Sequence, residues 1–338
     1  MIAGTERARP LAILRYVALA LIATVLLLPV YWLLMSSLRP ADQIFRHAGT
    51  FGLETLVPLQ LTLENFRFIF SGHFPRALFN SMFIGVATVT LGVFVNSLAG
   101  FAFAVFEFPC KRALFALVLL SFMMPFEAIV IPLYTLMRGL GWTDTYTALI
   151  LPEVAGGLVI FLFRQFFAGI PKEIYEAARL DGATWWRVYR RMTLPLSGPT
   201  IATASLILFI HQWNAFFWPL VAASREELAV VKVVIARNMT LEQANWGALF
   251  ASASSAVLVA MVPFLFLQRY YIRVVASRPT ASAGSKFLRQ SCLLQHRICR
   301  VTRFDLAIDD KMNLGYRTAP NLVIPFARTH ECAPSPEQ

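Results

Sequence analysis

Long apolar stretches alternate with short polar segments along this chain of 338 residues. Six stretches of at least 19 residues contain either no charged residue or a single acidic one. They cover residues 16–38, 77–106, 113–137, 145–163, 192–224 and 243–268. An α-helix rises ~1.5 Å per residue, so about 20 residues cross the ~30 Å hydrocarbon core of a bilayer. The pattern therefore predicts an all-α polytopic membrane protein with six transmembrane helices.

The composition favours a membrane protein over a soluble one. Hydrophobic residues make up 57% of the chain and charged residues 14%, whereas a typical globular chain is about 25% charged. The net charge is +11, but Lys and Arg lie at the ends of the apolar stretches and form no single basic face. We therefore expect membrane lipid, and no nucleic acid, around this protein.

The distribution of positive charge predicts the orientation. If the N-terminus is cytoplasmic, the inside segments up to residue 278 carry fourteen Lys and Arg residues, and the outside segments carry eight. Cytoplasmic loops carry the excess of positive charge in membrane proteins. We therefore expect a multi-pass protein with both termini in the cytoplasm.

The composition changes after Arg278, where Ser, Arg, Pro and Cys become more frequent and no further apolar stretch follows. We expect a membrane domain over residues 1–278 and a loosely ordered tail over residues 279–338. Potential metal ligands in the tail are Cys292, His296, Cys299, His330 and Cys332. Their spacing is irregular, so we expect no metal site.

Polar and helix-breaking residues inside the stretches predict how the helices pack. The second stretch contains Asn80, Ser81, Thr88, Asn96 and Ser97, which favour hydrogen bonds to neighbouring helices. Later stretches contain Pro125, Pro132, Pro152, Gly156, Gly157, Pro219 and Pro263. These residues predict kinks or short unwound segments, which serve either helices that rearrange or static bends packed by their neighbours.

The most polar segment of the membrane domain separates the fourth and fifth stretches and covers residues 164–195. Pro171 suits the start of a helix over residues 172–181, on which Ile174, Ala177 and Ala178 share a face. Gly182 suits the end of that helix, and Thr184 suits the start of a second short helix through Arg191. The small alanines and the flanking charges suit a docking element, although an amphipathic connector resting on lipid headgroups has the same pattern.

A motif in this segment carries a family resemblance. It consists of Glu176-Ala177-Ala178, then Gly182, nine further residues, Met192, one residue, and Leu194-Pro195. The segment resembles the loop motif of permease subunits of bacterial ATP-binding-cassette importers, with Met192 where Ile is common. The carbohydrate-importing branch, and the smaller permease of the maltose transporter in it, is also similar at residues 36–40, 62–66, 124–134 and 213–220.

The resemblance implies six helices, both termini in the cytoplasm, a bacterial inner membrane, and docking of residues 164–195, the coupling loop, to an ATPase subunit. The docking residues that it implies are Glu176, Ala177, Ala178, Asp181, Gly182, Leu194 and Pro195. It also implies three kinds of partner, namely a second permease subunit, two ATPase subunits and an extracytoplasmic substrate-binding protein. None of the five lysines follows a glycine, so the chain has no phosphate-binding P-loop. We expect no cofactor in this chain, because ATP is used by a partner subunit.

Polar residues within the apolar stretches are candidates for a substrate pathway. Glu127 and Glu153 lie in the third and fourth stretches, where a charge is expected to face the bundle interior or water. His211, Trp213 and Asn214 lie in the fifth and offer an aromatic face and hydrogen-bonding groups to a sugar. Structural hydrogen bonds and aromatic packing are the competing explanations for these residues.

The sequence thus predicts a permease subunit that imports a carbohydrate, and not an enzyme, since the histidines are scattered and no HExxH or GxSxG motif occurs. An importer of the same type for glycerol 3-phosphate or an oligosaccharide is the first alternative. A phosphate would require cationic groups in the pathway, and we find no Lys or Arg inside the stretches. An ion-coupled secondary carrier working through Glu127 and Glu153 is the second alternative.

Overall fold

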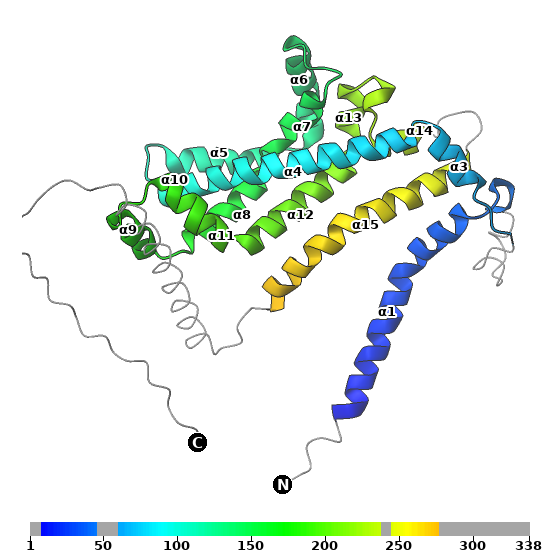
Figure 1. The fold of residues 1–338 in the computed structure, drawn as a ribbon, viewed down its shortest axis with the longest axis horizontal. Coiled ribbons are helices and arrows are strands. Elements are labelled where there is room, and N and C mark those ends of the chain that lie inside the picture. Colours follow the sequence, from blue (N-terminus) through cyan, green and yellow to red (C-terminus); the bar gives the residue numbers. More distant parts are fainter. Residues whose placement is uncertain (1–7, 46–59, 238–244, 277–338) are drawn as a thin grey trace, which may run out of the picture. The chain divides into compact units, whose positions relative to one another are not determined.

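The computed structural model describes residues 8–45, 60–237 and 245–276, which are helical with no strand among them (Figure 1). Its long helices are α1 (Ala8–Ser37), α4 (Phe74–Val105) and α15 (Trp246–Ala276). The shorter ones are α3 (Glu64–Ser71), α5 (Lys111–Met123), α6 (Phe126–Gly139), α7 (Tyr146–Val154), α8 (Gly157–Ala168), α9 (Lys172–Leu180), α10 (Trp185–Val188), α11 (Leu194–Leu196), α12 (Gly198–Asn214), α13 (Phe217–Ala222) and α14 (Val231–Arg237). Single turns are η1 (Ala41–Gln43), η2 (Tyr189–Thr193) and η3 (Glu226–Leu228).

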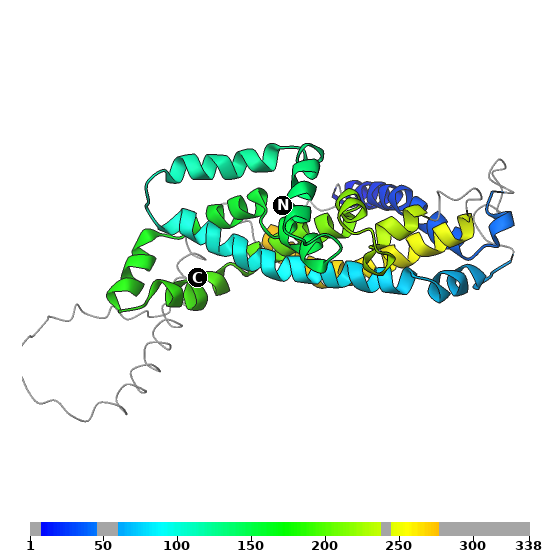
Figure 2. The same ribbon diagram turned by 90° about the horizontal axis from the view of Figure 1, so that it is seen from above.

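Helix α4 is central to the packing, because it lies along α8 and α12 and also contacts α7 and α14 (Figures 1 and 2). Two glycines allow this close approach. A Cβ on Gly92 would lie 2.8 Å from Cδ1 of Leu208 in α12, and a Cβ on Gly100 would lie 2.5 Å from Cβ of Phe163 in α8. Small residues at such contacts let membrane helices pack backbone to backbone.

Three of the crossings are bent pairs of helices. Helices α5 and α6 meet at 103°, α7 and α8 at 42°, and the segment Trp185–Leu196 meets α12 at 80°. Three other helices are long and apolar enough to cross a bilayer alone, so the bent pairs complete the six predicted crossings. The breaks predicted at Pro125 and Gly156 are confirmed. The predicted stretch 192–224 forms α11, α12 and α13, and its break lies at residues 215–216, shortly before Pro219.

Asn96 of α4 satisfies the backbone of the break between α7 and α8. Its Nδ2 donates to the Val154 carbonyl at 2.7 Å, and its Oδ1 accepts the Gly156 N–H at 2.9 Å. Asn96 is fully buried, and an unpaired backbone group within a membrane is strongly unfavourable. The side chain therefore replaces the helical hydrogen bonds that the break removes.

Asn80 has the same function near the other end of α4. Its Nδ2 donates to the carbonyls of Glu227 and Ala229 at 2.8 and 3.0 Å, and its Oδ1 accepts the Tyr146 hydroxyl at 2.8 Å. The side chain thus holds α7 and the segment around η3 against α4. The predicted hydrogen bonds from the second stretch to other parts of the bundle are confirmed at both asparagines.

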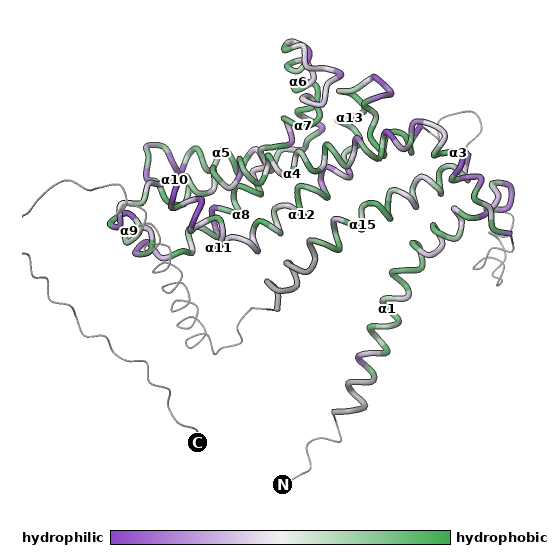
Figure 3. The backbone as a smooth tube through the Cα atoms, in the orientation of Figure 1, coloured by the Kyte–Doolittle hydropathy of each residue, from purple (hydrophilic) through white to green (hydrophobic). Residues whose placement is uncertain are grey.

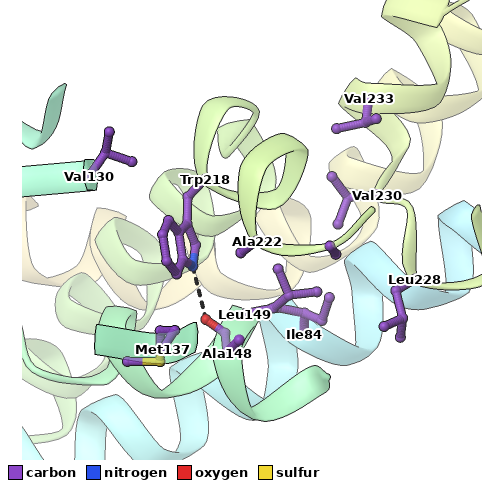
Figure 4. Close-up of a cluster of buried hydrophobic side chains, with 11 residues drawn as sticks. Ile84, Val130, Met137, Ala148, Leu149, Trp218, Ala222, Leu228, Val230 and Val233 are labelled. Carbon is purple, nitrogen blue, oxygen red and sulfur yellow. Dashed lines mark hydrogen bonds between the residues drawn. The ribbon is translucent and has the colours of Figure 1, made fainter. Parts of the chain in front are cut away.

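A hydrophobic cluster surrounds this end of the bundle (Figure 4). Trp218 of α13 is buried, and its Nε1 donates to the Ala148 carbonyl of α7 at 2.9 Å. Ile84 of α4, Leu149 of α7 and Met137 of α6 belong to the same cluster. Helices α4, α6, α7 and α13 therefore meet in one apolar cluster that includes the Trp218 indole.

Asn65 joins the first crossing to the last. Its Nδ2 donates to the carbonyls of Ser37 and Arg39 at 3.0 and 2.7 Å. The Cβ position of Gly247 in α15 is occupied by the Asn65 amide. Two of the segments on which the family resemblance depends, residues 36–40 and 62–66, thus meet in space.

The hydropathy of the residues follows the predicted division into apolar membrane stretches and a polar loop (Figure 3). Helices α1, α4 and α12 are mainly hydrophobic, whereas the segment around α9 and α10 is hydrophilic. Helix α3 lies between the first and second predicted apolar stretches. The predicted tail, residues 279–338, and its Cys and His residues lie outside the described residues.

We expect Gly100→Ala to destabilise the bundle by ~1–3 kcal/mol, because overpacking forces two backbones apart. The new methyl group would lie 2.9 Å from the Arg164 backbone nitrogen as well as against Phe163. The measurement is the free energy of unfolding in mixed micelles titrated with denaturing detergent. Gly139→Ala is the control, because a Cβ at Gly139 has no atom within 4 Å. Equal stability of the two variants would contradict the packing explanation.

Candidate functional site: the coupling loop and the Glu153–His211 pair

The coupling loop begins with α9, whose end is fixed by a left-handed glycine. Gly182 has φ +77°, a conformation that favours glycine. The Ala183 N–H donates to the Ala178 carbonyl at 3.0 Å, and the Gly182 N–H donates to the Arg179 carbonyl at 3.1 Å. These bonds form a Schellman-type end, as the sequence indicated. The preceding helix α8 extends to Ala168, so the first residues of the predicted loop are helical.

The second half of the loop returns to the membrane through an irregular helix. The Thr184 hydroxyl accepts the Arg187 N–H at 3.3 Å and caps α10, as predicted. The α-helical turn ends at Val188, earlier than the predicted Arg191, and a π-helical turn, η2, follows. Such turns occur often at functional sites. Helix α11, which begins with Leu194 and Pro195, then leads into α12.

Two tyrosines fasten the loop to the bundle. The Tyr175 hydroxyl of α9 donates to the Phe167 carbonyl at 3.2 Å, and Tyr189 of η2 shares a 2.7 Å hydrogen bond with Ser97 of α4. Both rings lie edge-on to Phe101 of α4, with centroids 6.3 and 5.4 Å away. Burial raises the pKa of Tyr175 to about 12, so the hydroxyl stays protonated and can donate at physiological pH.

The opposite face of α9 points away from the bundle. Glu176, Ala177 and Asp181 are exposed, and Leu180 is 88% exposed. Ala178 is instead half-buried and packs in the cluster around Tyr175. The structure thus divides the predicted alanine face, because Ala178 contacts this chain while Ala177 remains accessible. Leu180 is an exposed apolar residue that the sequence analysis did not select.

Two predicted pathway residues are in contact. Oε2 of Glu153 in α7 lies 3.2 Å from Nδ1 of His211 in α12. The Glu153 side chain is 13% exposed and the His211 side chain 64% exposed. The two residues are 58 positions apart in the sequence, so spacing alone gave no signal that they would meet.

The other predicted pathway residues lie apart from this pair, and Trp213 packs against a buried cluster that includes Phe74 of α4 and Ala248 of α15. Trp213 stacks on Phe209 with ring centroids 5.7 Å apart, and Asn214 Nδ2 donates to the Ile210 carbonyl at 2.9 Å. Glu127 is exposed in the first turn of α6, just beyond the break, and not in the middle of a continuous helix. Within the described residues, no hydrogen bond or ion pair joins Glu127 to the Glu153–His211 pair.

Comparison with known proteins places this arrangement in a family. Residues 96–276, more than half of the chain, match the family model for the binding-protein-dependent transport system inner membrane component. The matched region includes the coupling loop and the Glu153–His211 pair. It also includes the three bent crossings.

Individual relatives are also transport permeases. The chain is 34% identical over 258 residues to the arabinooligosaccharides transport system permease protein AraQ of Halalkalibacterium halodurans, covering 76% of this chain and 91% of that protein. It is 30% identical over 259 residues to the sn-glycerol-3-phosphate transport system permease protein UgpE of Rhizobium meliloti, covering 74% and 90%.

The fold is also that of a solved membrane transporter. A chain in the crystal structure of a bacterial ABC transporter involved in the import of the acidic polysaccharide alginate superimposes with a TM-score of 0.67. The match covers 80% of this chain and all of that chain at 20% identity. The predicted fold class is confirmed, and the chain belongs to the family of inner-membrane components of binding-protein-dependent transport systems, which are transport permeases and not enzymes.

Proposed function

We propose that this chain is the permease subunit of an ATP-driven importer that moves a carbohydrate from an extracytoplasmic binding protein into the cytoplasm. Family membership supports transport that depends on a binding protein. The similarity to a permease named for arabinooligosaccharides supports a sugar or oligosaccharide as the substrate.

The observation that carries the proposal is the face of α9 that points away from the bundle. Glu176, Ala177 and Leu180 are exposed there, on a helix whose other face is anchored by Tyr175. An anchored helix with an exposed leucine and an adjacent carboxylate suits insertion into a groove of another protein. We assign that groove to an ATPase subunit, because this chain has no P-loop of its own and therefore needs a partner to use ATP.

The proposed assembly contains this chain, a second permease subunit, two ATPase subunits and the binding protein. The bundle exposes apolar side chains on several helices, for example Leu117 and Leu120 of α5 and Ile131 of α6. Such side chains suit contact with lipid or with the second permease. No cofactor is assigned to this chain.

Transport in this proposal proceeds by movement of the coupling loop. Closure of the ATPase subunits on ATP moves α9, and Tyr175 and Tyr189 transmit the movement to α4 through Phe101. The bundle then alternates between inward-facing and outward-facing states, each stabilised by different contacts.

Import of glycerol 3-phosphate is a second candidate, because UgpE is also similar to this chain. The Glu153–His211 pair favours the sugar. His211 already has a carboxylate at 3.2 Å, and a like-charged phosphate beside Glu153 would be repelled. Neutral sugar hydroxyls meet no such repulsion.

We expect Gly182→Val to abolish sugar uptake and release the ATPase subunits, because valine is strained at φ +77° and would alter the end of α9. Glu176→Gln is expected to weaken ATPase binding about tenfold through loss of a charge-assisted contact. The measurements are ATP-dependent uptake of radiolabelled arabinooligosaccharide in proteoliposomes and co-purification of the ATPase. Glu64→Gln, an exposed carboxylate in the first turn of α3, is the control. Full uptake and normal co-purification in both loop variants would refute docking through α9.

The proposed orientation predicts accessibility on opposite sides of the membrane. In a chain expressed without the ATPase subunits, and with Cys110, Cys292, Cys299 and Cys332 replaced by Ser, Leu180→Cys is expected to react with a membrane-impermeant maleimide only after permeabilisation. Leu140→Cys, which follows α6 and is exposed, is expected to react in intact spheroplasts. The measurement is the shift in mass of the labelled chain. Labelling of Leu180→Cys in intact spheroplasts would place the loop outside and reverse the assignment.

A further inference from the structure

The Glu153–His211 pair has no part in loop docking. Its position in the fold suggests a different function. Helices α8 and α12 leave the two ends of the coupling loop and also contact each other. Glu153 lies four residues before α8 begins, and His211 lies three residues before α12 ends. The loop therefore joins one end of α8 to one end of α12, and the Glu153–His211 contact joins the other end of α12 to the end of α7, just before α8.

Each partner of the pair lies beside a break in its crossing. The α7 helix ends at Val154, and α12 ends at Asn214 before the unwound residues 215–216. A change in the angle at either break alters the distance between the Glu153 carboxylate and the His211 ring. The separation of the pair thus reports directly on the arrangement of the two breaks.

The backbone next to Glu153 is held by α4. Asn96 bonds the Val154 carbonyl and the Gly156 N–H, and the Cβ position of Gly92 lies 3.2 Å from the same carbonyl. Because this segment is fixed to α4, a shift of α12 along α4 changes the Glu153–His211 distance without an equal shift of Glu153.

The chemistry of the pair makes its two states distinct. Glu153 is largely buried within a membrane-spanning region, where a carboxylate without a partner is strongly unfavourable. When α12 moves away, water or substrate hydroxyls must replace the imidazole. Separation of the pair is therefore coupled to hydration of the pathway.

We propose that Glu153 and His211 are positioning residues that couple movement of the coupling loop to opening of the membrane pathway, by tying the end of α7 to the end of α12 in one state of the cycle and releasing it in the other. This inference rests on the proposed function, since it requires ATP-driven movement of the loop. It assigns to the pair the efficiency of coupling, and not the binding of the ATPase.

The test measures sugar uptake and ATP hydrolysis in the same proteoliposomes, containing the complete transporter and its binding protein. The variants are Glu153→Gln, His211→Gln and the double variant. Coupling between linked sites typically amounts to 5–150-fold, so we expect each single variant to lower the sugar transported per ATP by about tenfold while the ATPase still co-purifies. The double variant is expected to be no worse than either single one, because both remove the same interaction.

Glu107→Gln is the matched control, since Glu107 forms a local 3.1 Å ion pair with Lys111 and its own side chain is 81% exposed. If Glu153→Gln fails to fold, His211→Gln still tests the inference, because the His211 side chain is mostly exposed and its replacement is expected to leave the fold intact. An unchanged ratio of uptake to hydrolysis in His211→Gln, or single effects that multiply in the double variant, would overturn the inference. Failure of the proposed function would instead be seen as unmodified transporter that takes up no sugar with ATP.

Discussion

The structure depends on satisfying backbone polar groups at helix breaks inside a membrane. Unbroken helices satisfy their own backbone, but the break between α7 and α8 leaves the Val154 carbonyl and the Gly156 N–H without helical partners. Asn96 of α4 supplies both partners, and Asn80 does the same for the segment around η3. Because these asparagines lie on one continuous helix, α4 fixes the bent crossings relative to each other while leaving the crossings themselves bent.

The two ends of α4 differ in a way that suits transmission of movement. Near Asn80, hydrogen bonds and the cluster around Trp218 join α4 to α6, α7 and α13. At the other end, Phe101 lies between two tyrosines of the coupling loop. Aromatic rings in edge-on contact transmit displacement while each tyrosine hydroxyl keeps its hydrogen bond. In the proposed transport cycle, a movement of the loop therefore reaches α4 through these rings, while the contacts of Asn80 and Trp218 hold the far end.

Local features of the sequence predicted most of the fold and of the loop. Apolar length predicted the crossings, Gly182 and Thr184 predicted the end of α9 and the start of α10, and the polar side chains of α4 predicted hydrogen bonds between parts of the bundle. Pairings over long distances were not predictable, because no local pattern joins Glu153 to His211 or Asn65 to Ser37 and Gly247. The π-helical turn η2 also escaped prediction, since tertiary packing decides it.

A carboxylate within a membrane-spanning region is stable only with a partner, and Glu127 and Glu153 meet this requirement differently. Glu127 is exposed at a break, where water, lipid headgroups or a second permease can solvate it. Glu153 is largely buried and has His211 as its partner. Its state is therefore tied to the position of α12, whereas that of Glu127 depends on surfaces outside this chain. For this reason the internal geometry of this subunit constrains Glu153, whereas it leaves the surroundings of Glu127 open.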